Sequence, residues 1–375
     1  MDATPKKAPL ETPLAERYRA ANVNLAPYFG VLLPTRFADP ADEQRLARQT
    51  AVLVDTNFRA AFSLTGPDRV RYLNAVMTNN VRDLKPNQGT IGLLLNSQGH
   101  ILDELETLAF DDSILILGHA FNCEATAATL DKFIIMDDAM LTDRSDHTGM
   151  LAIEGPAAMA IVNEVAGVDL TLLEQYTHVE TSVASANGAI ACDLVRQSLY
   201  GFPGAEFIVA RENIAELRQA LEAAARKHGG APIGYEALNA LRLEAGIPWF
   251  GTDFGEHQIP HEAGLEKSHI SYTKGCYTGQ EIVERVRSRG HVNKRLTGLA
   301  FGGAEIPERG AALTAGGAEA GEVTSAAFSP LLGRAMGLGY VRREHDRIGE
   351  KLQCGSLSAE VIELPLPGAA TKESA

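Results

Sequence analysis

The segment with the clearest chemical potential runs from Lys274 to Glu281 and reads Lys-Gly-Cys-Tyr-Thr-Gly-Gln-Glu. It predicts a loop that leads into a short helix, because Thr278 and Glu281 have the spacing of a capping box. A helix N-terminus carries partial positive charge, which together with Lys274 would favour the thiolate form of Cys276. The pattern therefore predicts a reactive thiol at Cys276, and the alternative is a buried, inert cysteine.

The remaining cysteines differ from Cys276 in their surroundings. Cys192 falls within an apolar predicted strand, where burial would disfavour the thiolate. Cys123 begins a predicted helix next to the negative Glu124, and Cys354 has no basic neighbours. We therefore expect Cys276 to react first.

Two other groups of residues could take part in chemistry. Asp103 and Glu104 follow a predicted hairpin turn and, being adjacent in a strand, point to opposite faces, so only one of them can face a site. Glu206 begins a predicted strand and could form a paired hydrogen bond to an amino-pyrimidine edge. The alternative for Asp103 and Glu104 is a solvated hairpin rim, and the alternative for Glu206 is a charge at the end of a strand. Arg242 and Glu244 are interpreted as a helix-end ion pair.

Composition limits the possible classes of protein. The 375 residues suggest two or three domains, and the formal charge of −14 argues against broad nucleic-acid or anionic-membrane binding. A local basic patch is still expected at 285–295. The four cysteines form no CxxC pair, which indicates neither a disulfide framework nor a zinc site, and no metal site is expected. The start resembles no signal peptide and no stretch could span a membrane, so we expect a cytoplasmic location.

Hydrophobic periodicity predicts an α+β body built from two similar halves. A strand at 60–66 is followed by Pro67 and a helix, and a strand at 150–155 is followed by Pro156 and a helix. Strand–Gly–Pro–helix therefore occurs twice, about ninety residues apart, and the alternative is coincidence. A hairpin is expected between these two units, at 90–109.

Short apolar runs separated by Gly-rich turns near the C-terminus predict a small β-barrel or β-sandwich. The expected organisation begins with an N-terminal tail at 1–25 and an α+β body at 26–245. A linking segment with the Lys-Gly-Cys motif follows at 246–294, then the barrel at 295–365 and a tail at 366–375.

The motif resembles the signature of the YgfZ-type folate-binding proteins, which are relatives of the glycine cleavage T-protein. The matching positions are Lys274, Gly275, Cys276, Tyr277, Gly279, Gln280 and Glu281. Segments at 64–67, 93–99, 241–246 and 329–341 resemble parts of the T-protein family. The resemblance implies two similar α+β portions and a C-terminal β-barrel around a central tetrahydrofolate site.

The resemblance also implies roles for individual residues. Asp103 falls where the T-protein has an aspartate beside the folate, and Glu206 falls at its pterin-binding glutamate. Leu199 stands where that family has a tyrosine, so the adjacent Tyr200 becomes the candidate cofactor residue. Leu238 replaces a family arginine. These two departures count against aminomethyl transfer.

Two hypotheses follow from the sequence. In the preferred one, the protein binds tetrahydrofolate or a one-carbon derivative and assists iron–sulfur cluster assembly or repair, including that of tRNA-modifying enzymes, without turning over a small molecule. Its partners would be iron–sulfur client or assembly proteins, and Cys276 would be its functional thiol. In the alternative, the protein is a folate-dependent aminomethyltransferase or other one-carbon transferase, in which Asp103 orients the folate.

Overall fold

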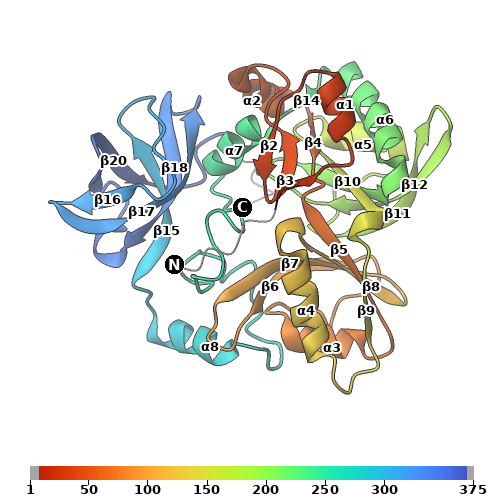
Figure 1. Ribbon diagram of the computed structural model, residues 1–375, viewed down its shortest axis with the longest axis horizontal. Coiled ribbons are helices and arrows are strands. Elements are labelled where there is room, and N and C mark those ends of the chain that lie inside the picture. Colours follow the sequence, from red (N-terminus) through yellow and green to blue (C-terminus); the bar gives the residue numbers. More distant parts are fainter. Residues whose placement is uncertain (1–7, 370–375) are drawn as a thin grey trace.

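The computed structural model describes residues 8–369, and its parts are arranged around a common centre (Figure 1). Two α+β portions lie one above the other on the right of the view, and a β-barrel lies on the left. The expected fold class, an α+β body followed by a C-terminal β-barrel, is confirmed. The predicted tails fall partly on residues 1–7 and 370–375, which lie outside the described residues.

The lower α+β portion contains a five-stranded sheet in the order β6-β7-β8-β5-β9. Its elements are β5 (Arg59–Thr65), α3 (Arg69–Val76), β6 (Gly89–Leu95), β7 (Ile101–Ala109), β8 (Ser113–His119), α4 (Cys123–Phe133) and β9 (Met140–Asp143). Leu73 of α3 and Leu130 of α4 pack with Phe62 of β5 in one apolar cluster. Both helices therefore cover the same face of the sheet.

The upper portion repeats this arrangement. Its sheet has the order β11-β12-β13-β10-β4-β14, and its first four strands correspond to β6-β7-β8-β5. Its elements are α2 (Pro40–Gln49), β4 (Val52–Asp55), β10 (Thr148–Glu154), α5 (Ala158–Ala166), β11 (His178–Ser185), β12 (Gly188–Arg196), β13 (Gly204–Ala210), α6 (Ile214–Lys227), β14 (Ala231–Pro232) and α7 (Tyr235–Glu244). Leu108 and Leu117 of the lower sheet pack with Val195 and Ile208 of the upper one, so the two sheets share a core.

The segment predicted as an N-terminal tail is folded from residue 10 onwards. It contains β1 (Leu10–Glu11) and α1 (Ala15–Ala20), followed by β2 (Leu25–Tyr28) and β3 (Val31–Pro34). Leu14 and Tyr18, four residues apart, are both buried in the core of the upper portion. This i, i+4 spacing puts them on one helical face, which explains why the segment docks.

The C-terminal strands form a closed barrel in the order β15-β18-β17-β16-β19-β20. They are β15 (Lys294–Phe301), β16 (Ala312–Ala315), β17 (Ala318–Ser329), β18 (Arg334–Arg342), β19 (Lys351–Cys354) and β20 (Leu357–Ile362). Leu299, Phe301 and Val341 are buried inside it. Beyond the barrel, Leu366 and Ala369 pack in one cluster with Leu243 of α7, so the predicted C-terminal tail begins as buried chain.

The linking segment at 246–294 leaves the end of α7 in the upper portion, passes the lower portion with α8 (Gln280–Arg289) and enters the barrel at β15 (Figure 1). The predicted capping box does not form, because Gly279 is the N-cap of α8 and no side chain caps it. Gly290 ends the helix in a left-handed conformation. The described residues also form four short 3-10 helices, namely η1 (Ala120–Asn122), η2 (Ser145–His147), η3 (Arg211–Asn213) and η4 (Arg343–His345).

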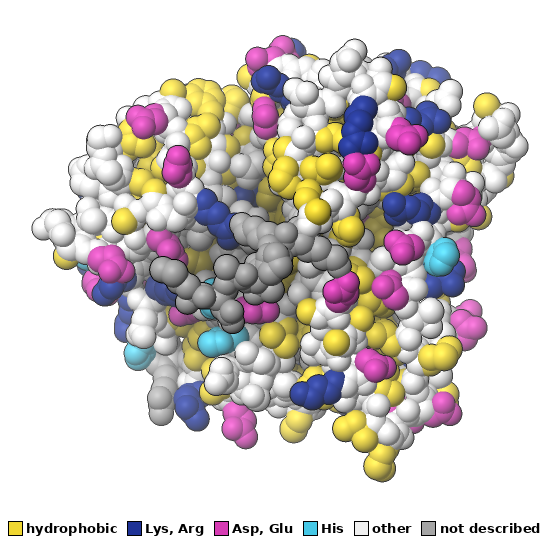
Figure 2. All heavy atoms as spheres, viewed as in Figure 1, with side chains coloured by type: hydrophobic (Ala, Val, Ile, Leu, Met, Phe, Trp, Pro, Cys, Tyr) yellow, Lys and Arg dark blue, Asp and Glu magenta, His cyan; other side chains and the backbone are white. Residues whose placement is uncertain are grey.

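The surface carries both signs of charge. On the face shown in Figure 2, basic and acidic side chains are interspersed over both α+β portions. Within residues 8–369, no helix is long and apolar enough to cross a membrane.

Candidate functional site

A cavity of about 1100 Å³ lies where the three parts of the molecule meet. The lower sheet contributes Glu104 and Glu106, the upper portion contributes Gln197, and the barrel contributes Thr297 and Ile362. The loop that follows α7 adds a stretch of residues at 246–250. A ligand held here would contact both α+β portions and the barrel, so the cavity is the strongest candidate for a small-molecule site.

Strand β7 places two carboxylates on the cavity wall. Glu104 and Glu106 are two residues apart, so they share one face of the strand, whereas Asp103 points to the other face. Glu104 and Glu106 line the cavity, and Asp103 does not. The prediction that Asp103 is the carboxylate beside the ligand is therefore not matched by its placement, and Glu104 occupies that position.

Asp103 is fully buried in a network of its own. His119 Nδ1 lies 3.1 Å from Asp103 Oδ1, and the amide of Glu104 donates to the same oxygen over 2.9 Å. The hydroxyl of Thr126 donates to the other oxygen. Since both oxygens of Asp103 are occupied by protein groups, its position points to a structural role between β7, β8 and α4.

A second group of polar residues surrounds Arg59 of β5. Its guanidinium donates to Glu106 over 2.8 Å, to Glu206 over 3.2 Å and to Gln197 over 3.4 Å. Burial disfavours the charged form of Arg59, but the two carboxylates outweigh it and raise its pKa. Burial also raises the pKa of Glu106, against the effect of Arg59. Glu206 itself is fully buried directly beside the cavity-lining Arg59.

This cluster leaves several hydrogen-bonding atoms unused. Within the described residues, Glu106 Oε2, Glu206 Oε2 and Gln197 Nε2 are buried and have no hydrogen-bond partner. Buried polar atoms in folded proteins are nearly always paired, so an unpaired group deserves a functional explanation. Glu106 and Gln197 line the cavity, whereas Glu206 is hydrogen-bonded to the cavity-lining Arg59 and does not line the cavity itself. A ligand with both donors and an acceptor would satisfy the unpaired atoms that it reaches.

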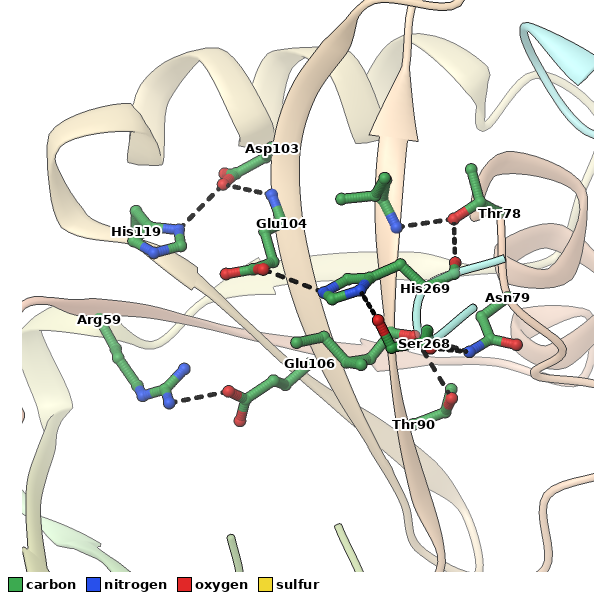
Figure 3. Close-up of polar contacts among 12 residues, drawn as sticks. Arg59, Thr78, Asn79, Thr90, Asp103, Glu104, Glu106, His119, Ser268 and His269 are labelled. Carbon is green, nitrogen blue, oxygen red and sulfur yellow. Dashed lines mark hydrogen bonds and ion pairs between the residues drawn. The ribbon is translucent and has the colours of Figure 1, made fainter. Parts of the chain in front are cut away.

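A third set of contacts includes two residues from the loop that precedes the motif. His269 Nε2 lies 3.0 Å from Glu104 Oε1, and His269 Nδ1 lies 2.8 Å from Ser268 Oγ (Figure 3). All three residues line the cavity. Burial alone would raise the pKa of Glu104, but the hydrogen bond from His269 and the nearby His119 and Arg59 lower it overall. Glu104 is therefore held as a carboxylate.

Tyr200, predicted to contact the cofactor, points away from the cavity. Its ring is fully buried, and its hydroxyl donates to the carbonyl of Glu154 over 3.1 Å. The buried carboxylate of Glu154 accepts from the amides of Tyr200 and Phe202 and thereby shapes this loop. The neighbouring Leu199 lines the cavity instead. The prediction for Tyr200 is therefore corrected, because the loop turns the side chain into the core.

The Lys274–Glu281 motif lies beside the cavity rather than in its wall, because no residue of the motif lines it. The ammonium of Lys274, which the sequence predicted to act on the thiol of Cys276, donates to the backbone carbonyls of Asn74, Met77 and Asn79. Burial lowers the pKa of Lys274 to about 8. Lys274 therefore ties the motif to the end of α3.

The other residues of the motif divide between core and surface. Tyr277 is buried in an apolar cluster with Leu93 and Phe250, whereas Cys276 is exposed. Gly279 has a φ of +83°, and a Cβ there would lie 2.7 Å from the carbonyl oxygen of Asn96. The motif positions Gln280 and Glu281 form the first turn of α8.

Sequence reasoning missed several residues of the cavity. Arg59, Glu106, Gln197, His119 and His269 were not predicted, and all five line it. Strand alternation could have revealed Glu106, since it shares a face with Glu104. No pattern in the sequence pairs Arg59 or His269 with these carboxylates, because the partners are far apart along the chain. Within residues 8–369, no group of acidic, His or Cys residues could hold a metal ion.

The architecture consists of two α+β portions with the same topology and a barrel, which surround a central cavity. Comparison with known proteins shows which family has this architecture. The model of the GCVT N-terminal domain matches residues 14–270. The model of the glycine cleavage T-protein C-terminal barrel domain matches residues 294–366. The chain therefore belongs to the family of the glycine cleavage T-protein.

Individual relatives agree with this assignment. The aminomethyltransferase of Rubrobacter xylanophilus is 30% identical over 95% of this chain and 91% of that protein. The aminomethyltransferase of Streptomyces coelicolor is 29% identical over 94% of this chain and 96% of that protein. The crystal structure of the glycine cleavage system aminomethyltransferase T from Bartonella henselae has the same fold, with a TM-score of 0.86 at 22% identity and coverage of 96% and 98%.

These findings overturn the preferred functional prediction. An accessory role in iron–sulfur metabolism is wrong, because relatives that match over nearly the full chain are named aminomethyltransferases. These matches give no support to the iron–sulfur client proteins expected as partners. The expected relation to tetrahydrofolate is confirmed for the family, whose aminomethyltransferases use it. The Lys274–Glu281 motif resembles that of the YgfZ-type subgroup, but the chain as a whole matches the wider T-protein family.

Proposed function

We propose that this protein is a folate-dependent aminomethyltransferase, which transfers a one-carbon unit to tetrahydrofolate bound in the central cavity. Membership of the T-protein family and the nearly full-length match to aminomethyltransferases support the reaction class. The location of the cavity between the two α+β portions and the barrel supports the site. Tetrahydrofolate supplies the nitrogen atoms that accept the one-carbon unit.

The unpaired atoms around Arg59 are the observation on which the folate site rests. The pyrimidine edge of a pterin offers N–H donors beside a carbonyl acceptor. Glu106 Oε2 and Glu206 Oε2 could accept from such donors, and Gln197 Nε2 could donate to the carbonyl. The residues present therefore fit the group, and we place the pterin end of the ligand against this cluster.

Glu104 takes the role that the sequence assigned to Asp103. Its carboxylate lies on the cavity wall, is held charged, and has one oxygen bound to His269. A carboxylate in this position can orient the ligand amine and stabilise positive charge that develops on it during transfer. The narrower YgfZ-type assignment, the cytoplasmic location, the domain boundaries and a functional thiol at Cys276 stay predictions.

The folate site is tested first by affinity. Glu206→Gln removes a charged acceptor while keeping the shape of the side chain, and we expect it to cost about 1.5–3 kcal/mol of binding, or roughly tenfold to over a hundredfold in Kd for tetrahydrofolate. Isothermal titration calorimetry measures this. Glu180→Gln, an exposed carboxylate on β11 of the same sheet, is the control. Unchanged affinity in Glu206→Gln would rule out the assigned role.

The reaction itself is tested by transfer. The purified full-length protein should form a one-carbon derivative of tetrahydrofolate from an aminomethylated lipoyl donor, and folate mass analysis detects the product. If the protein binds tetrahydrofolate but transfers no carbon from this donor or from an N-methyl donor, the proposed transferase activity is refuted and the proposed folate site stands.

A further inference from the structure

Phenylalanine and tryptophan side chains line the wall of the cavity beside the cluster around Arg59. They are Phe29, Phe58, Trp249 and Phe250. The guanidinium carbon of Arg59 lies 5.5 Å from the centre of the Phe58 ring, so this wall adjoins the polar cluster. Phe58 and Phe250 are buried, whereas Phe29 and Trp249 are partly exposed. The rings of Phe29 and Trp249 are therefore the part of the wall that a ligand can contact best.

Phe29 and Trp249 form a corner on this wall. Their ring centres are 4.9 Å apart, and the angle between the ring planes is 67°. Phe58 is stacked on Phe29 at 4.4 Å, and the guanidinium carbon of Arg242 lies over the indole, 4.4 Å from the ring centre. Arg242 is itself fully buried and paired with Asp253. Packing therefore fixes both rings, and a flat ring in the corner could stack on one and meet the other edge-on, as aromatic rings prefer.

The backbone of Phe29 indicates that its ring has a role beyond the turn. Phe29 and Gly30 join β2 to β3, with φ values of 51° and 73°. A two-residue hairpin turn with positive φ at both positions favours asparagine, aspartate or glycine at the first position, because larger side chains are strained there. Non-glycine residues in such conformations cluster at ligand sites. The ring of Phe29 is therefore retained at a position where its backbone is unfavourable.

Tetrahydrofolate has a second flat ring that matches this corner. A short methylene–amine linker joins its pterin to a p-aminobenzoyl ring. With the pterin against the Arg59 cluster, the p-aminobenzoyl ring lies next to the adjoining aromatic wall. The polar cluster offers the hydrogen-bonding atoms that suit a pterin edge, whereas the corner offers ring surface for an aryl group.

We propose that Phe29 and Trp249 bind the p-aminobenzoyl ring and make the cavity selective for folates over pterins that lack this ring. The two side chains come from distant parts of the chain, the β2–β3 hairpin and the loop after α7. Phe29 packs in one cluster with Val54 of β4 and Leu241 of α7, so the selectivity requires the N-terminal hairpin to be docked on the upper portion. This inference rests on the proposed function for the location of the pterin.

Five full-length proteins test the proposal. They are the wild type, Trp249→Leu, Phe29→Leu, Trp249→Phe and the control Phe121→Leu. Phe121 is stacked on Phe250 at 5.6 Å but is 45% exposed and does not line the cavity. Anaerobic isothermal titration calorimetry gives Kd for tetrahydropteroate, which carries the aryl ring, and for 6-methyltetrahydropterin, which lacks it. The ratio of the two Kd values is the readout, because loss of folded protein affects both ligands equally.

We expect the wild type to bind tetrahydropteroate roughly tenfold to a hundredfold more tightly than 6-methyltetrahydropterin. Trp249→Leu and Phe29→Leu should each reduce this ratio by about fivefold or more, with Kd for 6-methyltetrahydropterin within about threefold of the wild type. Trp249→Phe should retain most of the ratio, because it keeps an aromatic face, and Phe121→Leu should retain all of it. An unchanged ratio in Trp249→Leu or in Phe29→Leu would overturn the proposal, and so would an equal loss of affinity for both ligands.

A spectroscopic readout locates the aryl ring directly. Trp249 is the single tryptophan, so its indole protons are readily assigned, and nuclear Overhauser effects should connect them to the aryl protons of bound tetrahydropteroate. Absence of these effects in the saturated complex would overturn the inference. A wild type that shows the selectivity and these contacts but transfers no carbon would instead refute the proposed activity. A wild type that transfers a carbon to tetrahydrofolate yet shows no aryl selectivity would refute this inference alone.

Discussion

At the residue scale, β7 separates a structural carboxylate from one that is free to meet a ligand. Asp103 has both oxygens occupied by His119, Thr126 and a backbone amide. Glu104 uses Oε1 for His269 and faces the cavity. Because adjacent strand residues point to opposite faces, the two carboxylates cannot exchange roles.

This difference makes a direct prediction. Glu104→Gln should lower the rate of one-carbon transfer by about a hundredfold or more, because it removes charge from the reacting region, while the fold is retained. Asp103→Asn should instead lower the free energy of unfolding by about 1–3 kcal/mol, since its buried partners lose an acceptor. Transfer kinetics and urea denaturation of both variants measure these effects. If Asp103→Asn abolishes transfer at unchanged stability, Asp103 has the role that the sequence assigned to it.

The four cysteines should differ in reactivity. Cys276 is exposed, whereas Cys192 and Cys354 are buried. Burial raises the pKa of Cys192 to about 12, and burial together with Asp143 raises that of Cys123 to about 11. Thiolates are the species that alkylate, so Cys276 should be modified first near neutral pH. Limiting iodoacetamide followed by peptide mass analysis tests the order, and earlier labelling of Cys123 would contradict it.

At the element scale, the start of α8 depends on backbone geometry rather than on a side-chain cap. Gly279 adopts a positive φ and packs closely against the turn at Asn96. Lys274 anchors the preceding loop through three backbone carbonyls. The motif therefore holds the start of α8 against the turn that joins β6 to β7. Strand β7 carries Glu104.

Substitution of the motif glycines tests this account. Gly279→Ala should lower the free energy of unfolding by about 1–3 kcal/mol. The new Cβ would clash with the carbonyl of Asn96, and the φ of this residue is unfavourable for alanine. Gly275→Ala should change stability by less than about 0.5 kcal/mol, since the space around Gly275 is open. Thermal unfolding of both variants provides the comparison. Equal stabilities would mean that the close packing at Gly279 does not matter.

At the scale of the whole molecule, Asp253 connects the α+β body to the barrel. It forms a fully buried ion pair with Arg242 of α7 and accepts from Thr324 and Ser325 of β17. Arg242 therefore pairs with Asp253 rather than with Glu244, which pairs with Arg48. The barrel closes one side of the cavity, so this junction also supports the site.

Loss of Asp253 should weaken the whole structure. Asp253→Ala leaves Arg242 buried without its counter-ion, and we expect a loss of about 3–5 kcal/mol. The single tryptophan, Trp249, donates its amide to Asp253 and lies under Arg242, so its fluorescence reports on this junction during guanidinium unfolding. Glu319→Ala, which breaks an exposed barrel pair with Arg342, should cost less than about 1 kcal/mol. A change below 1 kcal/mol in Asp253→Ala would contradict the assigned role.

The sequence by itself determined the local elements and the repeat. Apolar spacing predicted β5, α3, the β6–β7 hairpin, β10 and α5, because strand and helix periodicity are properties of residues close together in the chain. Short apolar runs between Gly-rich turns predicted a small β-barrel or β-sandwich, and the structure shows a closed barrel. The motif and the T-protein-like segments led to the correct wider family.

Only the tertiary structure decided which side chains form the site. Alternation in β7 shows that Asp103 and Glu104 diverge, but which of them faces the cavity depends on how the sheets and helices pack. Tyr200 points into the core because the buried carboxylate of Glu154 accepts a hydrogen bond from its backbone amide and so fixes the loop. Arg59 and Glu206 are 147 residues apart and meet only when both sheets share a core. Such contacts depend on long-range packing, which the local pattern of residues does not specify.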